Sequence, residues 1–299
     1  MTVDFSGRLA DLIDKESPVE QLASGFRFLE GPVWHREGRY LLFCDWMDHH
    51  IQRWSERDGV QVYRERSNSA TGLTYEPRGG LIAAERRRSS GGDGGRRVAR
   101  LLEDDRSEDL ATHYQGGRLS SPNDLVCLAN GDIVFTDPDG GLEHSDGTKE
   151  PREVPCNGVY RFVAADGTLH LVTGEIESPN GIVKRDGVPE LLVVDRRTIR
   201  RVDLETGAVS LFSDLKHGDL HGHADGMKLD VRGNLYVSGG PEGVWVLDPE
   251  GQPLGLIEVG EQAINLAWGG DDWRTLYIVG RNALYRVGMK VEGQPLNPA

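Results

Sequence analysis

The sequence is short of cysteine and of basic residues, and each shortage excludes a class of protein. Its 299 residues include three cysteines, Cys44, Cys127 and Cys156, with no Cys-x-x-Cys pair. An odd, scattered set of this kind is not a disulfide framework and fits a reducing compartment. Lysine and arginine number 34 against 48 acidic residues, which gives a net charge of −14. We therefore expect no binding to nucleic acid or to an anionic membrane.

Long apolar runs and several catalytic signatures are also missing. The polar N-terminal segment has no apolar core of a signal peptide, and no run is long enough to span a bilayer. We expect a cytoplasmic protein. The chain has no Gly-x-Ser-x-Gly turn, which disfavours a serine hydrolase, and no Rossmann or P-loop fingerprint.

What the sequence does contain is one pattern that occurs six times. A small or turn-forming residue leads into a short apolar strand, which is followed by a strongly apolar strand and by one rich in arginine or aromatic residues. The repeats begin at Gly31, Gly72, Asp124, Gly181, Gly226 and Asn265. This spacing is typical of four-stranded propeller blades. With no helical period, the pattern favours an all-β, six-bladed β-propeller over a sandwich or an open repeat array, as one domain over residues 1–299.

The sixth repeat lacks a fourth strand of its own. The stretch Val19–Phe26 precedes the first repeat and has no other place in the pattern. We expect it to become the outer strand of the last blade, because closing the ring in this way protects the sheet edges.

Two insertions interrupt the repeats. Arg86–Arg96 is rich in arginine, serine and glycine, and we expect a flexible hairpin tip there. Gly140–Pro155 is longer and polar and follows a second strand. It is read either as a surface loop or as a lid near one mouth of the channel, and both readings stay open.

The first strand of each blade lines the channel of a propeller, so the residues at its start converge on one mouth. Four blades place a hard oxygen donor there: Glu30, Asn123, Asn180 and Asp225. Such residues are common at turns for backbone reasons, but four at equivalent positions indicate a site. Oxygen ligands without thiolate or imidazole favour Ca²⁺ over Mg²⁺ or Mn²⁺. The sequence therefore predicts one divalent metal in the channel.

Several segments resemble a known family when they are taken together and in order. They are Leu29–Trp34, Ser121–Val126, Phe135–Pro138, Ser178–Ile182, Asp225–Met227 and Asn265–Gly270. They are similar to the gluconolactonase, senescence-marker-protein (regucalcin) and luciferin-regenerating-enzyme family over nearly the whole chain. The resemblance implies a propeller with one metal, which is calcium, zinc or manganese in different members.

The resemblance also implies roles for individual residues. Glu30, Asn180 and Asp225 would be side-chain metal ligands, and Asn123 would bind the metal or the substrate. Asp225 and Asp124 would be candidates for proton transfer. The chain departs from the family pattern at Asp139, where an aromatic wall is usual, and at Ser121, where regucalcin-like members carry an arginine. These departures predict a substrate polarity unlike that of the best-known members.

Lactone hydrolysis needs a polarised carbonyl, an activated water and a stabilised oxyanion. A metal with open coordination positions supplies the first and third, and a carboxylate supplies the second. We therefore expect a metal-dependent lactonase acting on a small, sugar-derived or related lactone, with Asp225 or Asp124 as the base. A phosphotriester or phosphorus–fluorine hydrolase on the same metal, and a non-catalytic calcium-binding propeller, are the alternatives.

The loop before Asp225 carries three histidines, His217, His221 and His223. It lacks the regularity of a zinc site, so we expect His221 or His223 to contact the substrate instead. We also expect the second strands to run away from this mouth. By that geometry Arg196 and Arg197, which follow a second strand, lie at the opposite end of the channel.

Overall fold

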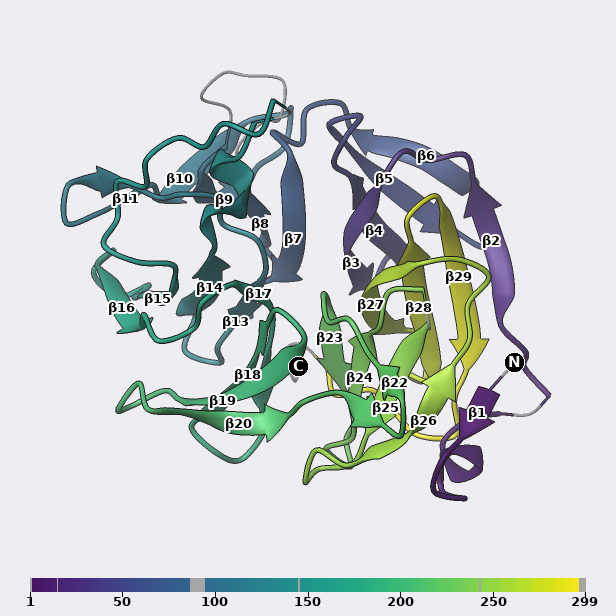
Figure 1. The fold of residues 1–299 in the computed structure, drawn as a ribbon. Coiled ribbons are helices and arrows are strands. Elements are labelled where there is room, and N and C mark those ends of the chain that lie inside the picture. Colours follow the sequence, from purple (N-terminus) through teal and green to yellow (C-terminus); the bar gives the residue numbers. More distant parts are fainter. Residues whose placement is uncertain (1, 15, 87–94, 145, 242, 296–299) are drawn as a thin grey trace.

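Six antiparallel sheets stand around a common centre (Figure 1). The structure, a computed structural model, describes residues 2–14, 16–86, 95–144, 146–241 and 243–295. The innermost strands of successive sheets contact one another in sequence, and the last contacts the first. The predicted all-β, six-bladed propeller with four-stranded blades is confirmed.

The blades follow one another along the chain, each running from the innermost strand outward. Blade 1 holds β3 (Leu29–His35), β4 (Tyr40–Asp45), β5 (His50–Ser55) and β6 (Gly59–Arg64). Blade 2 holds β7 (Ala70–Tyr75), β8 (Leu81–Glu85), β9 (Arg97–Leu101) and β10 (Ser107–Ala111). Blade 3 holds β13 (Leu125–Cys127), β14 (Ile133–Asp137), β15 (Gly158–Phe162) and β16 (Leu169–Thr173).

The other half of the ring repeats this plan. Blade 4 holds β17 (Pro179–Arg185), β18 (Glu190–Asp195), β19 (Thr198–Asp203) and β20 (Val209–Ser213). Blade 5 holds β23 (Met227–Leu229), β24 (Leu235–Ser238), β25 (Val244–Leu247) and β26 (Pro253–Ile257). Blade 6 holds β27 (Ala263–Gly269), β28 (Thr275–Gly280), β29 (Ala283–Gly288) and, from the N-terminal region, β2 (Glu20–Ser24).

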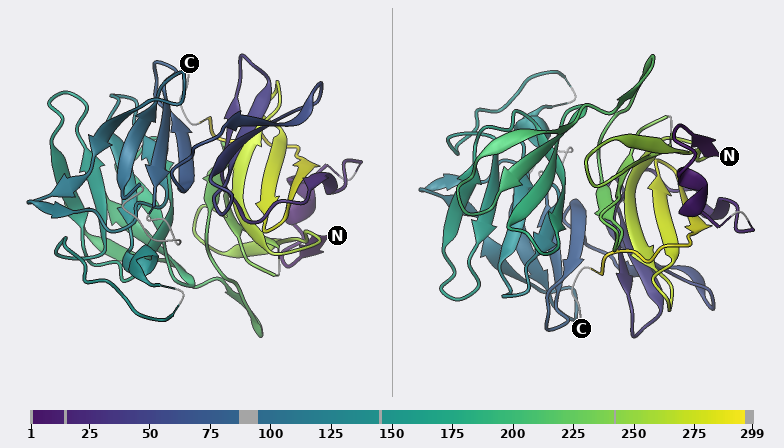
Figure 2. Two further views of the ribbon diagram at one scale, coloured as in Figure 1. Left: turned by 90° about the horizontal axis from the view of Figure 1, so that it is seen from above. Right: turned by 90° about the horizontal axis from the view of Figure 1, so that it is seen from below.

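The N-terminal region closes the ring, as the sequence predicted. β2 pairs antiparallel with β29 and is the outer strand of blade 6. The region also adds β1 (Thr2–Asp4) to the edge of blade 5, beside β26. Both strands lie on the outside of the ring when the molecule is turned (Figure 2). The pairing of β1 was not predicted, because its three exposed residues carry no apolar pattern.

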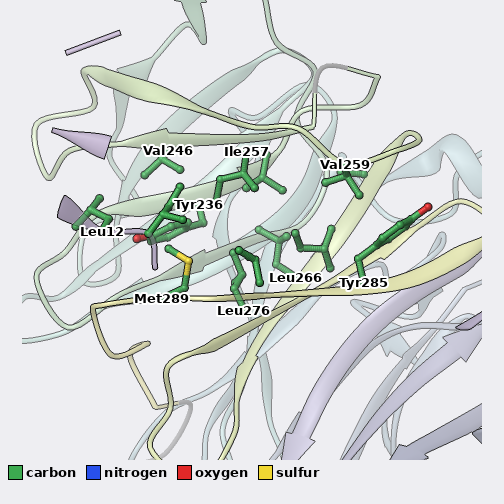
Figure 3. Packing of buried hydrophobic residues seen from close by; sticks show 14 of the residues in the cluster. Leu12, Tyr236, Val246, Ile257, Val259, Leu266, Leu276, Tyr285 and Met289 are labelled. Carbon is green, nitrogen blue, oxygen red and sulfur yellow. The ribbon is translucent and has the colours of Figure 1, made fainter. Parts of the chain in front are cut away.

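Apolar side chains between the blades form the core. The second strands are buried along most of their length, because a neighbouring blade covers each of their faces, whereas the outer strand β6 is largely exposed. Between blades 5 and 6 a cluster joins Tyr236, Leu266 and Leu276 to Leu12 and Met289 from the two terminal segments (Figure 3). Both ends of the described chain therefore help to hold these blades together.

The direction of the second strands differs from the expectation. Asp195, at the end of β18, pairs with Pro179 at the start of β17, and Asp45, at the end of β4, pairs with Leu29 at the start of β3. A second strand therefore ends at the mouth where the first strand begins. The expected placement of Arg196 and Arg197 at the opposite end of the channel is wrong, and they lie on the same side as Asn180.

The opposite end of the channel holds a cavity of about 400 Å³ with a mainly apolar lining. Gln294 crosses it near the end of the described chain, because its backbone N–H donates to Leu229 and its side chain to the Lys184 carbonyl. Within the described residues, none of the helices has the length and apolar character needed to cross a bilayer.

Candidate functional site

The four oxygen donors stand at equivalent places around one end of the channel. Glu30 and Asn180 are the second residues of β3 and β17, and Asn123 and Asp225 lie two residues before β13 and β23. The side chain of Asp225 accepts a hydrogen bond from Asn180, and its negative charge acts on Glu30. Asn123 is half-buried, as are Asn180 and Asp225, whereas Glu30 is only 5% exposed.

Carboxylates at the ends of three second strands fix the segments that carry three of these donors. Asp45 accepts the backbone N–H groups of Arg27 and Phe28, at 3.0 and 3.1 Å. Asp137 accepts those of Ser120 and Ser121, and Asp195 accepts that of Ser178. Each of these aspartates therefore holds the backbone two residues before a donor, namely Glu30, Asn123 or Asn180. The sequence carried this signal, because three second strands end in aspartate, but its meaning was missed.

Small residues follow the donors and let neighbouring blades approach closely. A Cβ on Gly31 would lie 2.5 Å from the carbonyl oxygen of Thr71 in the next blade, and one on Gly181 would lie 2.0 Å from that of Asp225. In blades 3 and 6 the equivalent residues are Asp124 and Asn265, and their side chains link the blades instead. The amide of Asn265 donates to Glu30 of blade 1 at 3.4 Å.

Asp124 is held by the same kind of link. One carboxylate oxygen accepts the N–H of Leu125 at 2.9 Å, and the other accepts the N–H of Ile182 in blade 4 at 3.2 Å. Burial raises the pKa of Asp124, and the nearby ammonium group of Lys228 opposes that rise. The position therefore joins two blades, whatever part it takes in proton transfer.

The four oxygen donors Glu30, Asn123, Asn180 and Asp225 are called the donor ring. The electrostatics of the donor ring favour a cation. Burial raises the pKa of Glu30, and the charge of Asp225 raises it further. Burial also raises the pKa of Asp225, to about 7, with a further contribution from the charge of Asp124. The charge of Arg86 opposes both rises, but within the described part of the chain neither Glu30 nor Asp225 forms a salt bridge. One buried and one half-buried carboxylate without a close ion-pair partner are expensive to ionise.

Arg86 is the functional candidate that the sequence analysis missed. It follows β8, so it emerges at the mouth, and its guanidinium carbon lies 4.9 Å from the centre of the Trp46 ring. Burial lowers the pKa of Arg86, and the charges of Glu30 and Asp225 counteract this. Residues 87–94 of the segment Arg86–Arg96, which was expected to be a flexible hairpin tip, lie outside the described residues.

The described residues contain no group of three or more His, Cys, Asp or Glu side chains that could hold a metal. The predicted set does not depend on such a group, because it combines only two carboxylates with two asparagine amides. The prediction of a metal therefore depends on the four oxygen donors described above.

Comparison with known proteins decides the family. Residues 28–281 match the family described as the SMP-30/Gluconolactonase/LRE-like region. A gluconolactonase of Zymomonas mobilis is 30% identical over 97% of this chain and 86% of its own length. Pentonolactonase XacC of Haloferax volcanii is 28% identical over 84% of this chain and 81% of its own. The solved structure of a gluconolactonase from Xanthomonas campestris superposes with a TM-score of 0.83 at 27% identity, covering 96% of this chain and 94% of that one.

The chain belongs to the SMP-30/gluconolactonase/LRE-like family. The predicted resemblance is confirmed.

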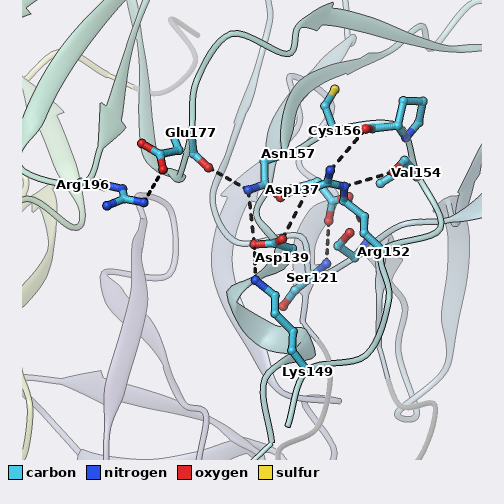
Figure 4. Close-up of polar contacts among 12 residues, drawn as sticks. Ser121, Asp137, Asp139, Lys149, Arg152, Val154, Cys156, Asn157, Glu177 and Arg196 are labelled. Carbon is cyan, nitrogen blue, oxygen red and sulfur yellow. Dashed lines mark hydrogen bonds and ion pairs between the residues drawn. The ribbon is translucent and has the colours of Figure 1, made fainter. Parts of the chain in front are cut away.

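Within this family framework, the Gly140–Pro155 insertion begins at the mouth. Its first turn, η2 (Asp139–Leu142), brings Gly141 against Ser121, and a Cβ on Gly141 would lie 3.7 Å from a terminal nitrogen of Arg86. Asp139 anchors the segment, because it pairs with Lys149 at 3.0 Å and with Arg152 at 3.2 Å (Figure 4). The carboxylate of Asp139, at the position where the resemblance implied an aromatic residue, is thus paired with basic side chains of the insertion.

The remaining mouth residues are exposed. His221 lies in the short hairpin of β21 (Lys216–His217) and β22 (Leu220–His221), whereas His223 packs over Gly240 beside the mouth. Arg196, which shares this side of the molecule, is 63% exposed and pairs with Glu177 at 2.5 Å (Figure 4). Substrate contact by His221 or His223 stays a prediction. The direction of the second strands no longer favours these histidines over Arg196, because all three residues lie on the same side of the molecule.

Proposed function

We propose that this protein is a metal-dependent lactonase that opens the ring of a small, sugar-derived lactone. The observation that carries the proposal is the ring of four oxygen donors at one mouth of a gluconolactonase-family propeller. Two named relatives, a gluconolactonase and a pentonolactonase, support the lactone as the substrate class. The same donors and family support a hydrolase over a calcium-binding scaffold.

The donor set fits a divalent cation. Glu30 and Asp225 are carboxylates that repel each other and have no ion pair among the described residues. A charge of +2 would offset both, and oxygen-only ligands suit Ca²⁺ best, with Mn²⁺, Mg²⁺ and Zn²⁺ as alternatives. Glu30, Asn180 and Asp225 would hold the ion, with Asn123 at or beside it. The backbone carbonyl groups of Asn123 and Asn180 accept hydrogen bonds from the hydroxyl groups of Thr71 and Thr136, which orients these two residues and leaves the oxygens of their side-chain amides available.

When bound, the cation supplies Lewis-acid polarisation of the lactone carbonyl. The chain's own groups orient the reactants and move the proton. Asp225 is better placed than Asp124 to accept a proton from the attacking water, because both oxygens of Asp124 already accept backbone N–H groups. The amide of Asn180 holds the carboxylate of Asp225 in place by a hydrogen bond. The proton then passes to the ring oxygen as the carbonyl–oxygen bond breaks.

Hydrolysis of a panel of aldonolactones, followed with a pH indicator, tests the proposal. The protein is first stripped with a chelator and then supplied separately with Ca²⁺, Mg²⁺, Mn²⁺ or Zn²⁺. We expect activity to vanish after chelation and to return with at least one of these ions. Full activity in the chelated protein would exclude the metal mechanism, and inactivity towards every lactone with every ion would exclude the lactonase.

A further inference from the structure

Arg86 occupies an unusual place for a cation. It lies at the channel mouth, stacked on Trp46, with one terminal nitrogen beside Gly141 of the insertion. Its backbone N–H donates to Ser69 at 3.2 Å, which fixes the base of the side chain. Trp46 follows β4 as Arg86 follows β8, so two adjacent blades hold the guanidinium from equivalent positions.

Other buried arginines of this protein show what a structural guanidinium looks like. That of Arg64 donates to three backbone carbonyl groups, and that of Arg96 donates to the Leu119 carbonyl and to Glu153. For Arg86, by contrast, the described residues provide no hydrogen-bond acceptor and no carboxylate within salt-bridge distance. A half-buried guanidinium is costly without such partners, so a position of this kind is one that a ligand can complete.

Once the other charges of the site are paired, the positive charge of Arg86 remains uncompensated. Ionised Glu30 and Asp225 carry two negative charges, which a divalent ion would cancel. The charge of Arg86 then remains as a surplus positive charge at the mouth of a protein whose net charge is −14. The nearby carboxylate of Asp139 does not oppose an incoming anion, because Lys149 and Arg152 already neutralise it.

We propose that Arg86 binds an anionic group of the substrate, so that the preferred lactone carries a carboxylate or phosphate in addition to its ring. This inference rests on the proposed lactonase function. The guanidinium is a planar fork that bonds such oxyanions through two parallel N–H groups, and stacking on Trp46 keeps the fork in one orientation. The donors begin the innermost strands, whereas Arg86, Trp46 and Gly141 all follow second strands. The residues that follow the second strands would thus hold the anionic substituent, while a cation at the donor ring would hold the reacting carbonyl.

The test compares three lactones of similar size: gluconolactone, its phosphate ester, and glucarolactone, which carries a carboxylate. They are assayed with the metal-loaded wild type and with the variants Arg86→Gln and Arg86→Lys. Arg196→Gln is the matched control, because it removes an exposed arginine from the same side of the molecule. Calorimetric Ca²⁺ binding and thermal unfolding of each variant show whether the donor ring and the fold are retained.

We expect the wild type to favour one anionic lactone over gluconolactone by about tenfold or more in kcat/KM, because charge-assisted bidentate bonds are the strong class. Arg86→Gln loses that preference, because its kcat/KM falls by about tenfold or more for the favoured anionic lactone and by clearly less for gluconolactone. Arg86→Lys keeps part of the preference, and Arg196→Gln keeps it all. Which anionic lactone is favoured distinguishes carboxylate from phosphate.

An equal rate for all three lactones in the wild type, or an unchanged preference in Arg86→Gln, overturns the inference and leaves the lactonase standing. A parallel calorimetric titration with sorbitol, which is uncharged, and with gluconate phosphate and glucarate separates the two proposals. If no lactone is hydrolysed but an anionic acid binds through Arg86, the anion site stands and the lactonase falls. If no lactone is hydrolysed and Arg86→Gln binds the anionic acids as the wild type does, both the anion site and the lactonase are rejected.

Discussion

Asp124 and Asp225 both stand near the mouth end of innermost strands, yet their surroundings differ. Asp225 is half-buried and bonded to the Asn180 side chain, whereas Asp124 is 5% exposed and bonded to two backbone N–H groups. Asp124, which accepts hydrogen bonds from two blades, therefore stabilises the ring of blades. Asp225, which faces the other oxygen donors, is available to act on a ligand.

Asp124→Asn should therefore lower stability more than activity. Asparagine replaces one acceptor oxygen with an amide N–H₂, which would face a backbone N–H and leave it unsatisfied, at a cost of about 1–3 kcal/mol. Urea unfolding and kcat on the best lactone measure the two effects. Loss of kcat by more than about 100-fold at unchanged stability would instead identify Asp124 as the base.

Asp225→Ala should reduce kcat/KM by at least about 100-fold and weaken Ca²⁺ binding in calorimetry, because one charged ligand of the cation is lost. Cys127→Ser is the matched control, since Cys127 is buried on β13, and burial raises the pKa of its thiol to about 12. We expect that variant to hydrolyse lactone normally and at most to be less stable, by about 1–3 kcal/mol for the buried hydroxyl. Retention of most activity in Asp225→Ala would show that the site is misassigned.

At the scale of elements, the second strands set the geometry of the mouth. Their last residues clamp the segments before the donors, and the residues that follow them, such as Trp46, Arg86 and Asp139, form the rim. The insertion after β14 is part of this rim because Asp139 anchors it. Burial raises the pKa of Asp139, but hydrogen bonds from Lys149 and Asn157 outweigh that effect and leave it lowered.

Asp139→Ala should loosen the insertion and raise KM by about threefold to tenfold, with a smaller effect on kcat, because Gly141, which lies beside Arg86 at the mouth, loses its support. Limited proteolysis between residues 140 and 155 measures the loosening. Asp146→Ala is the control, since Asp146 lies in the same insertion but, among the described residues, accepts hydrogen bonds only from Thr148. An unaltered KM together with faster proteolysis would place the insertion outside the substrate site.

The lowered pKa of Asp139 also gives a pH dependence. A carboxylate with a depressed pKa contributes its stabilisation above the unfolded value, and this is lost as the pH falls through the folded value. We therefore expect the insertion of the wild type to become protease-sensitive in acid, below the ordinary aspartate pKa of about 3.9. Asp139→Ala should be equally sensitive at neutral and at acid pH, and a parallel change in both proteins would contradict this.

At the scale of the whole molecule, the ring is closed by a strand that comes from outside the repeats. Without residues 1–25, the edge of β29 is exposed because β2 is missing, and the contacts of Leu9, Leu12 and Ile13 with blades 5 and 6 are lost. An unpaired edge of this kind invites aggregation.

Removal of residues 1–25 should therefore give an aggregated or unfolded protein, because several buried side chains at about 2–5 kcal/mol each approach the total stability of a domain. Removal of residues 1–3 alone takes most of β1, whose residues are exposed. We expect that shorter truncation to leave the melting temperature within a few degrees of wild type. Size-exclusion chromatography and calorimetry compare the two, and a folded, monodisperse protein without residues 1–25 would show that closure is dispensable.

The sequence by itself determined the fold and the positions of the donors. Strand periodicity and turn-forming residues are local properties, so their repetition along the chain revealed six blades and the closing role of Val19–Phe26. Glu30, Asn123, Asn180 and Asp225 could be predicted as a set because repeats place equivalent residues at equivalent points of a ring. The direction of the second strands was also available from antiparallel pairing, and the expectation for Arg196 was an error of inference.

Only the tertiary structure decided which side chains meet at the mouth. Arg86 lies at the start of a segment of arginine, serine and glycine without periodicity, so nothing local indicates that Trp46, 40 positions earlier, would hold it in the channel mouth. Asp124 resembled a base in the sequence, and its bond to Ile182 in the next blade appears only once the ring is closed. The physical reason is that strand patterns depend on near neighbours along the chain, whereas the charge and hydrogen bonding of a channel depend on blades brought together by folding.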